Sequence, residues 1–240
     1  MYSDNRSNFD LLILAGGLGS RLSPVLKDLP KPLANINGSP FLDYVINFYS
    51  KSDLIRNIYI SAGYLSEKIV ATYDGRTYNN KSIFVIVENK PLGTGGAIKY
   101  ASKYIESSEF IIINGDSFID YNIHEFIDYY LLNLPDILIL SNEVEDVSRF
   151  GEILVNDGCV TGFKEKQSVK KKGLINSGVY LLNKRVLTKD SFISFSFEDF
   201  LTENVANLNI ESFATSGDFI DIGVPDALIE AQNFFRNKET

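Results

Sequence analysis

The sequence is poor in the residue types that thiol and imidazole chemistry requires. Of its 240 residues, one is cysteine and one is histidine. Cys159 has no second cysteine with which to form an internal disulfide, so nothing indicates an oxidising compartment. His124 lies in a segment that reads as the start of a surface helix, which argues against a Cys–His nucleophile. The ligand spacing that structural zinc sites need is also missing.

Basic residues and long apolar runs are scarce as well. The 31 acidic residues outnumber the 23 basic ones, which gives a formal charge of −8. Such a balance argues against a sequence-independent nucleic-acid binder, which needs a basic face, although local lysines and glycine amides can still bind a small anion. The first apolar run, 11–15, is far too short for a signal peptide or a membrane span. We therefore expect a cytoplasmic protein that binds neither nucleic acid nor a membrane.

The first half of the chain alternates strand and helix signals. The run Leu11–Leu14 is wholly apolar and ends in glycines, which is typical of a strand buried on both faces of a parallel sheet. Ser39-Pro40 predicts a helix start, with the serine as N-cap and the proline as first helical residue. Further strands are expected at 57–61, 82–87, 110–113 and 136–141, and helices at 41–49, 66–73, 95–105 and 123–132. The alternation predicts an α/β fold with a Rossmann-like, doubly wound, mostly parallel sheet flanked by helices.

The pattern changes from Arg149 onward. Strands joined by short turns are expected at 151–155, 159–164 and 174–182, and helices at 196–206 and 225–235. We interpret this part as a cap on the same sheet that supplies the second half of a cleft. Because no long linker interrupts the chain, we expect one domain over residues 1–240.

A glycine-rich loop, Leu14-Ala15-Gly16-Gly17-Leu18-Gly19-Ser20-Arg21-Leu22, follows the first predicted strand. Glycines let the backbone turn sharply and bring its N–H groups against an anion. A dinucleotide fingerprint starting at Gly17 would need a small residue where Leu22 stands. A Walker A loop would need Gly-Lys-Ser/Thr where Gly19-Ser20-Arg21 stands. The loop fits neither pattern, and a plain tight turn remains an alternative explanation of its glycines.

Two cationic groups close to this loop make it more specific. Arg21 carries a planar, permanently charged group suited to phosphate oxygens, and Pro30-Lys31-Pro32 stiffens the backbone around one lysine. With these residues the chain resembles the sugar-1-phosphate nucleotidylyltransferases, and within them the D-glycero-α-D-manno-heptose 1-phosphate guanylyltransferases. The resemblance continues, in the family's order, through Gly93-Thr94-Gly95-Gly96-Ala97, Asn114-Gly115-Asp116, Phe163-Lys164-Glu165-Lys166, Asn176-Ser177-Gly178-Val179-Tyr180 and Asp221-Ile222-Gly223.

The resemblance implies a fold and a reaction. The fold is the GT-A-like nucleotidyltransferase fold, with a nucleotide-binding half over 1–141 and a sugar-phosphate-binding half over 142–240. In the reaction, a sugar-phosphate oxygen attacks the α-phosphorus of an NTP and expels pyrophosphate. The nucleophile is already anionic, so the site has to supply alignment, charge neutralisation and Mg²⁺ rather than a general base.

Five charged residues match the family's catalytic positions. Asp116 and Asp221 correspond to the metal-binding aspartates, and two carboxylates completed by phosphate oxygens and water suit Mg²⁺. Arg21 and Lys31 correspond to the residues that bind the triphosphate, and Lys166 to the lysine that holds the incoming sugar phosphate. Asp116 and Asp221 can instead be ordinary turn or cap aspartates, and Lys31 a solvated loop residue.

The resemblance also implies contacts to the two substrates. Nucleotide contacts are expected from Leu14, Ala15, Gly16, Gly17, Gly19, Ser20, Glu88, Gly93, Thr94 and Gly95. Sugar contacts are expected from Gly151, Glu165, Lys166 and Asn176. Glu165 can equally be a solvent-facing strand residue, Asn176 can simply cap a turn, and Lys164 competes with Lys166 as the phosphate ligand.

The side chain at position 88 bears on the choice of base. Thymidine- and uridine-using relatives tend to have glutamine there, because an amide both donates to and accepts from a pyrimidine edge. An ionised glutamate only accepts, and guanine offers two adjacent donors, so Glu88 favours guanine. The alternatives are an exposed acid without this role, a uridylyl- or cytidylyltransferase acting on another small phosphate, and a catalytically silent nucleotide-sugar-binding regulatory protein.

Overall fold

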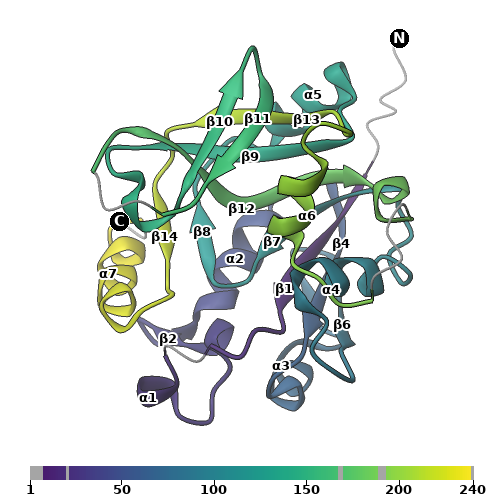
Figure 1. Cartoon of the computed structure of the whole chain (residues 1–240). Coiled ribbons are helices and arrows are strands. Elements are labelled where there is room, and N and C mark those ends of the chain that lie inside the picture. Colours follow the sequence, from purple (N-terminus) through teal and green to yellow (C-terminus); the bar gives the residue numbers. More distant parts are fainter. Residues whose placement is uncertain (1–7, 20–21, 167–169, 189–192, 239–240) are drawn as a thin grey trace.

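The structure, a computed structural model, describes residues 8–19, 22–166, 170–188 and 193–238. Its centre is a ten-stranded sheet to which both halves of the chain contribute, in the order β10-β11-β13-β9-β12-β7-β1-β4-β6-β5. Figure 1 shows this sheet running across the molecule. The ten strands are β1 (Phe9–Ala15), β4 (Ile55–Ala62), β5 (Thr77–Tyr78), β6 (Lys81–Val87), β7 (Glu109–Asn114), β9 (Ile137–Val144), β10 (Glu152–Asn156), β11 (Cys159–Lys164), β12 (Gly173–Asn183) and β13 (Ile210–Thr215).

Strands of the first half pair mainly in parallel, and those of the second half pair mainly antiparallel. β1 pairs in parallel with β4 on one side and β7 on the other, and β4 pairs in parallel with β6. β12 joins this half to the rest, antiparallel to both β7 and β9. The carboxyl ends of β1, β4, β6 and β7 therefore meet along one edge, where open α/β sheets bind ligands.

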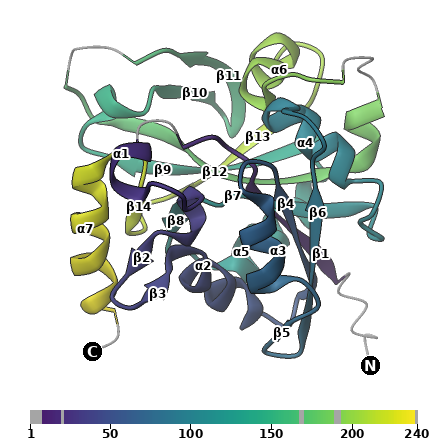
Figure 2. The same cartoon turned by 90° about the horizontal axis from the view of Figure 1, so that it is seen from below.

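Helices cover both faces of the sheet, because its apolar residues are buried on both sides. One hydrophobic core holds residues of α2 (Phe41–Ser50), α3 (Ser66–Tyr73), α5 (Ile123–Asn133) and α7 (Pro225–Arg236). The other holds residues of α4 (Gly93–Ala101) and α6 (Phe197–Asn204). In Figure 2, α4 and α6 lie on one side of the sheet, and α2, α3 and α5 on the other. The expected doubly wound α/β architecture is confirmed.

Several short elements complete the chain. β8 (Ser117–Ile119) and β14 (Phe219–Asp221) form a separate antiparallel pair, and β2 (Asn35–Ile36) and β3 (Ser39–Pro40) form a hairpin. The remaining short helices are α1 (Ser23–Leu26), η1 (Lys31–Leu33), η2 (Val147–Arg149) and η3 (Lys184–Thr188).

The predicted start of α2 is wrong. Ser39 and Pro40 belong to the hairpin, whose turn residues Asn37 and Gly38 have φ values of 51° and 95°, as in turns that suit twisted strands. α2 begins at Phe41 with Pro40 at the N-cap position and no capping side chain. Instead, the Phe41 N–H donates to the carbonyl of Ala34 across the hairpin at 2.9 Å. The helix is thus started by a tertiary contact rather than by a local cap.

Candidate active site

The turn that carries Asp116 packs against the end of β1. Gly115 follows β7, and its N–H donates to the carbonyl of Leu14 at 2.9 Å. A Cβ atom on Gly115 would lie 2.7 Å from that same oxygen, so a side chain there would push the turn away. A glycine at this position thus brings Asp116 next to the glycine-rich loop.

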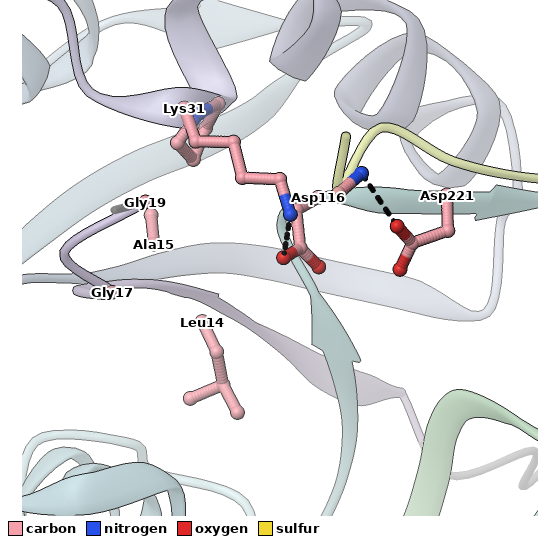
Figure 3. A pocket seen from close by; sticks show the side chains of 9 residues that line it. Leu14, Ala15, Gly17, Gly19, Lys31, Asp116 and Asp221 are labelled. Carbon is pink, nitrogen blue, oxygen red and sulfur yellow. Dashed lines mark hydrogen bonds and ion pairs between the residues drawn. The ribbon is translucent and has the colours of Figure 1, made fainter. Parts of the chain in front are cut away.

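Asp221 reaches the same place from the other end of the chain. In the β8–β14 pair, Asp221 lies opposite Ser117, and the N–H of Ile222 donates to the carbonyl of Asp116 at 2.9 Å. The Asp221 Oδ1 accepts a 2.6 Å hydrogen bond from the N–H of Gly223. Figure 3 shows the Asp116 and Asp221 carboxylates side by side in the pocket. Hydrogen bonds between the two main chains therefore fix the positions of Asp116 and Asp221 relative to each other.

Lys31 supplies the cation of the cluster. It lies at the start of η1, between Pro30 and Pro32, and its Nζ is 2.6 Å from the Asp116 Oδ2 (Figure 3). The Lys31 side chain is 12% exposed and that of Asp116 is 36% exposed, so the ion pair faces a hollow rather than open solvent. This hollow has a volume of about 350 Å³ and is lined by Leu14, Ala15, Gly17, Gly19, Lys31, Pro32, Asp116, Asp221 and Gly223.

The surroundings of Asp221 disfavour its ionised form. Burial and the nearby Asp116 carboxylate raise the pKa of Asp221 above its usual range, whereas Lys31, the Gly223 N–H and Lys166 act in the opposite direction. A cation placed between the aspartates would relieve this repulsion. Among the described residues, no group of three or more His, Cys, Asp or Glu side chains is placed to hold a metal ion, so any ion here would draw its other ligands from substrate and water.

A second hollow of about 430 Å³ adjoins the first and shares Leu14, Gly17 and Asp116 with it. Glu88 lines it from the end of β6, and Glu198 from α6. Its complete lining is Leu14, Gly16, Gly17, Leu18, Glu88, Pro91, Leu92, Gly93, Thr94, Ala97, Asn114, Asp116 and Glu198. The two hollows together form a cleft along the carboxyl edge of the sheet, with Asp116 where they meet.

The structure places Gly95 outside both hollows, although the sequence predicts that it contacts the nucleotide. It is buried and does not line either hollow, and its N–H donates to the carbonyl of Phe195 at 3.0 Å. A Cβ on Gly95 would lie 2.2 Å from the Phe195 ring, so the glycine serves close packing against that ring. Its neighbours Gly93 and Thr94 do line the second hollow, although the Thr94 hydroxyl already donates to Glu198.

None of the four expected sugar contacts lines the two hollows. Gly151 has a φ of 83° and packs against the backbone of Lys164, while Glu165 and Lys166 are exposed after β11. The Asn176 side chain accepts from the Gly178 N–H at 3.0 Å and donates to the Tyr180 hydroxyl at 2.8 Å, as expected for a residue that caps a turn.

The choice between Lys164 and Lys166 can be argued from their surroundings. The Lys164 Nζ lies 3.5 Å from the Glu152 carboxylate. The positive charge of Lys166, in contrast, is close enough to Asp221 to lower the pKa of that carboxyl group. Lys166 is therefore the better placed of the two to reach a ligand beside Asp221. Ser20 and Arg21 lie outside the described residues.

Glu198 and Asn114 show what sequence reasoning missed. Glu198 reaches the cleft through its bond to Thr94, which is 104 residues away, and no local pattern indicates such a contact. Asn114 could have been found, because it ends a buried strand directly before Gly115-Asp116.

The chain matches known proteins along almost its whole length. The family model described as "Nucleotidyl transferase" matches residues 11–238. The D-glycero-alpha-D-manno-heptose 1-phosphate guanylyltransferase of Aneurinibacillus thermoaerophilus is 36% identical over 225 residues, which are 93% of this chain and 96% of that protein. The protein of the same name from Campylobacter jejuni is 36% identical over 217 residues, with 90% and 95% coverage.

A solved structure agrees with these matches. HddC from Yersinia pseudotuberculosis complexed with GMP-PN has a TM-score of 0.83 and 39% identity, and the match covers 95% of this chain and 99% of that one. Within the described part of the chain, no helix has the length and apolar character needed to span a bilayer. The near-complete family match, together with the relatives that are 36% identical to it over most of its length, places the chain in the nucleotidyl transferase family.

Proposed function

We propose that this protein is a guanylyltransferase that condenses GTP with D-glycero-α-D-manno-heptose 1-phosphate to give a GDP-sugar and pyrophosphate. The observation that carries the proposal is that Asp116, Asp221 and Lys31 line one hollow together with Gly17 and Gly19. The guanine and heptose assignments are supported by the two guanylyltransferases that are 36% identical to this chain. The reaction consumes a nucleoside triphosphate, so we also propose that the protein works in the cytoplasm.

In the proposed reaction, a phosphate oxygen of the sugar 1-phosphate attacks the α-phosphorus of GTP. The new P–O bond forms as the bond to the β-phosphate oxygen breaks, and pyrophosphate leaves with that electron pair. Because the attacking oxygen is already anionic, the site needs no general base. Lys31 and Arg21 would stabilise the charge that moves onto the leaving group, and Lys166 would hold the incoming phosphate.

Asp116 and Asp221 would hold Mg²⁺. Both offer carboxylate oxygens to the same hollow. Burial first, and then the charge of Asp116, raise the pKa of Asp221, and a divalent cation would offset both effects by favouring the ionised carboxylate. When bound, the ion would supply charge neutralisation for the phosphates. The protein's own part is to place the two carboxylates next to Leu14–Gly19 through the main-chain contacts of Gly115 and Ile222.

Residues around the second hollow would bind the nucleoside. Glu88 would accept from the two donors of guanine, and Gly16, Gly17 and Gly93 line the same hollow without side chains that would fill it. Residues 1–141 would form the nucleotide-binding half and residues 142–240 the sugar-phosphate half. Gly151, Glu165 and Asn176 would approach the sugar once it is bound.

The Asp116→Asn variant tests the proposal. Turnover should fall on the order of 100-fold or more, because an amide binds Mg²⁺ poorly, while the binding of sugar phosphate should change little. Asp120→Asn is the matched control, because Asp120 is four residues away, is paired with Lys238 and does not line the cleft. Near-normal pyrophosphate release by Asp116→Asn would remove Asp116 from the metal site.

A further inference from the structure

A buried hydroxyl group lies directly behind the carboxylate of Glu88. Ser61 is on β4, with Leu14 of β1 and Ile86 of β6 as its strand partners, and it has no exposed surface. Its Oγ donates a 2.9 Å hydrogen bond to the Glu88 Oε1. A serine hydroxyl has one proton to donate, so this bond commits the donor of Ser61 to Glu88.

Other contacts fix the position of Glu88 on the remaining sides. Its backbone N–H donates to the carbonyl of Ala62 at 2.8 Å, which extends the β4–β6 pairing by one residue. A Cβ on Gly16 would lie 2.7 Å from the Glu88 Oε1, so the glycine-rich loop packs directly against the carboxylate. The Glu88 side chain is therefore held between the buried strand β4 and the loop.

We propose that Ser61 is a positioning residue that sets the preference for guanine by orienting the Glu88 carboxylate; this inference rests on the proposed function. The terminal torsion of glutamate is broad, so an untethered carboxylate would sample many orientations. A carboxylate has about four acceptor sites, and Ser61 uses one of them. The remaining acceptor sites of the carboxylate then lie in one fixed plane. A flat base with two adjacent donors on one edge needs its acceptors arranged in this way.

The proposal predicts a change in nucleotide preference rather than a general loss of activity. In Ser61→Ala, kcat/KM for GTP should fall about tenfold, the equivalent of about 1.4 kcal/mol, mainly through a higher KM. ATP, UTP and CTP do not present the donor pair of guanine, so their kcat/KM values should hardly change. Inosine triphosphate lacks the 2-amino donor, so its kcat/KM should fall less than that of GTP in Ser61→Ala.

Control variants separate this role from a merely structural one. Ser50→Ala removes another buried serine hydroxyl, at the end of α2 and away from the cleft, and should leave the preference unchanged. Ser61→Cys keeps nearly the same volume with a weaker donor and should lie between wild type and Ser61→Ala. In a Glu88→Gln background, Ser61→Ala should cause almost no further loss of kcat/KM for GTP, since the effects of substitutions in residues that act as one unit are not additive.

The outcomes are distinguishable. The inference is supported if GTP preference falls in Ser61→Ala, is intermediate in Ser61→Cys and is unaffected by Ser61→Ala once Glu88 is glutamine. It is overturned if Ser61→Ala or Ser61→Cys keeps the wild-type KM for GTP, or if the two substitutions are additive. If Glu88→Gln alone leaves the preference for GTP intact, the proposed reading of the base by Glu88 is also wrong.

Discussion

Replacement of Lys31 should change metal binding and catalysis in opposite directions. The Lys31 Nζ lies 2.6 Å from the Oδ2 of Asp116, one of the two aspartates that would hold Mg²⁺. At that distance and an effective dielectric constant of about 20, the attraction is roughly 6 kcal/mol before desolvation is subtracted. A partly exposed pair keeps a net contribution of up to about 1 kcal/mol. In Lys31→Met, Mg²⁺ should therefore bind the nucleotide-free protein up to about fivefold more tightly.

Catalysis by the same variant should be much weaker. Loss of a cation aimed at the leaving group typically costs about 3–4 kcal/mol of transition-state stabilisation, so kcat should fall roughly 100- to 1,000-fold. Calorimetric titration with Mg²⁺ and pyrophosphate release with GTP measure the two effects on one preparation. Lys164→Met is the control, because Lys164 pairs with Glu152 outside the cleft. The reasoning fails if Lys31→Met turns over normally, or if it binds Mg²⁺ more weakly than wild type.

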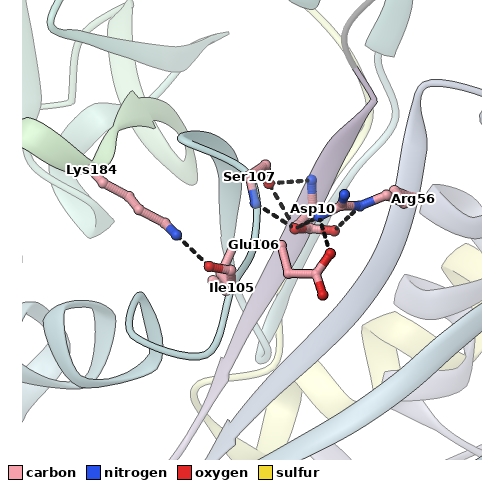
Figure 4. Close-up of polar contacts among 6 residues, drawn as sticks. All are labelled: Asp10, Arg56, Ile105, Glu106, Ser107 and Lys184. Atoms are coloured by element: carbon pink, nitrogen blue, oxygen red, sulfur yellow. Dashed lines mark hydrogen bonds and ion pairs between the residues drawn. The ribbon is translucent and has the colours of Figure 1, made fainter.

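Two further predictions concern aspartates whose pKa values shift in opposite directions. Burial and Asp116 raise the pKa of Asp221, so its ionisation disfavours the folded state: this penalty is absent below about pH 3.8 and grows as pH rises through the raised pKa. Asp221→Asn should accordingly melt at the wild-type temperature or above it at pH 7 without metal, while losing activity, and a clearly lower melting temperature would contradict this. Burial alone would raise the pKa of Asp10, but hydrogen bonds from Arg56 and Ser107 (Figure 4) outweigh it and hold the pKa below its usual range. Urea denaturation at pH 7 should therefore give Asp10→Asn a free energy of unfolding about 2–3 kcal/mol lower than that of the wild type. The difference should shrink as pH falls through the folded-state pKa of Asp10. Equal free energies of unfolding at pH 7 would refute this assignment.

Much of the sheet could be predicted from the sequence, because its strands are apolar runs bounded by glycine or polar residues. The strand at 159–164 and the helix at 66–73 have the predicted bounds. The strand β13 was missed, since its sequence Ile-Glu-Ser-Phe-Ala-Thr shows only weak alternation. Its place in the sheet comes from parallel pairing with β9, some 70 residues away along the chain.

The cleft was harder to predict in detail than the strands. Asp116 could be placed at the edge of the sheet because it lies two residues after the end of a buried strand. The hydrogen bond from Ser61 to Glu88 and the packing of Phe195 on Gly95 join residues that are distant in sequence, so no local pattern indicates them. The prediction of the start of α2 failed for the same reason, because the first N–H of the helix is bonded by the carbonyl of Ala34, seven residues earlier. Ser39 and Pro40, which resemble a helix start, belong to a β-hairpin instead.

The most direct test of the account is pyrophosphate release with Mg²⁺ over a matrix of the four nucleoside triphosphates and several sugar 1-phosphates. Pyrophosphate release should be fastest with GTP and D-glycero-α-D-manno-heptose 1-phosphate, and it should stop when Mg²⁺ is removed by a chelator. A strong preference for UTP or CTP, or turnover that persists without a divalent cation, would contradict it.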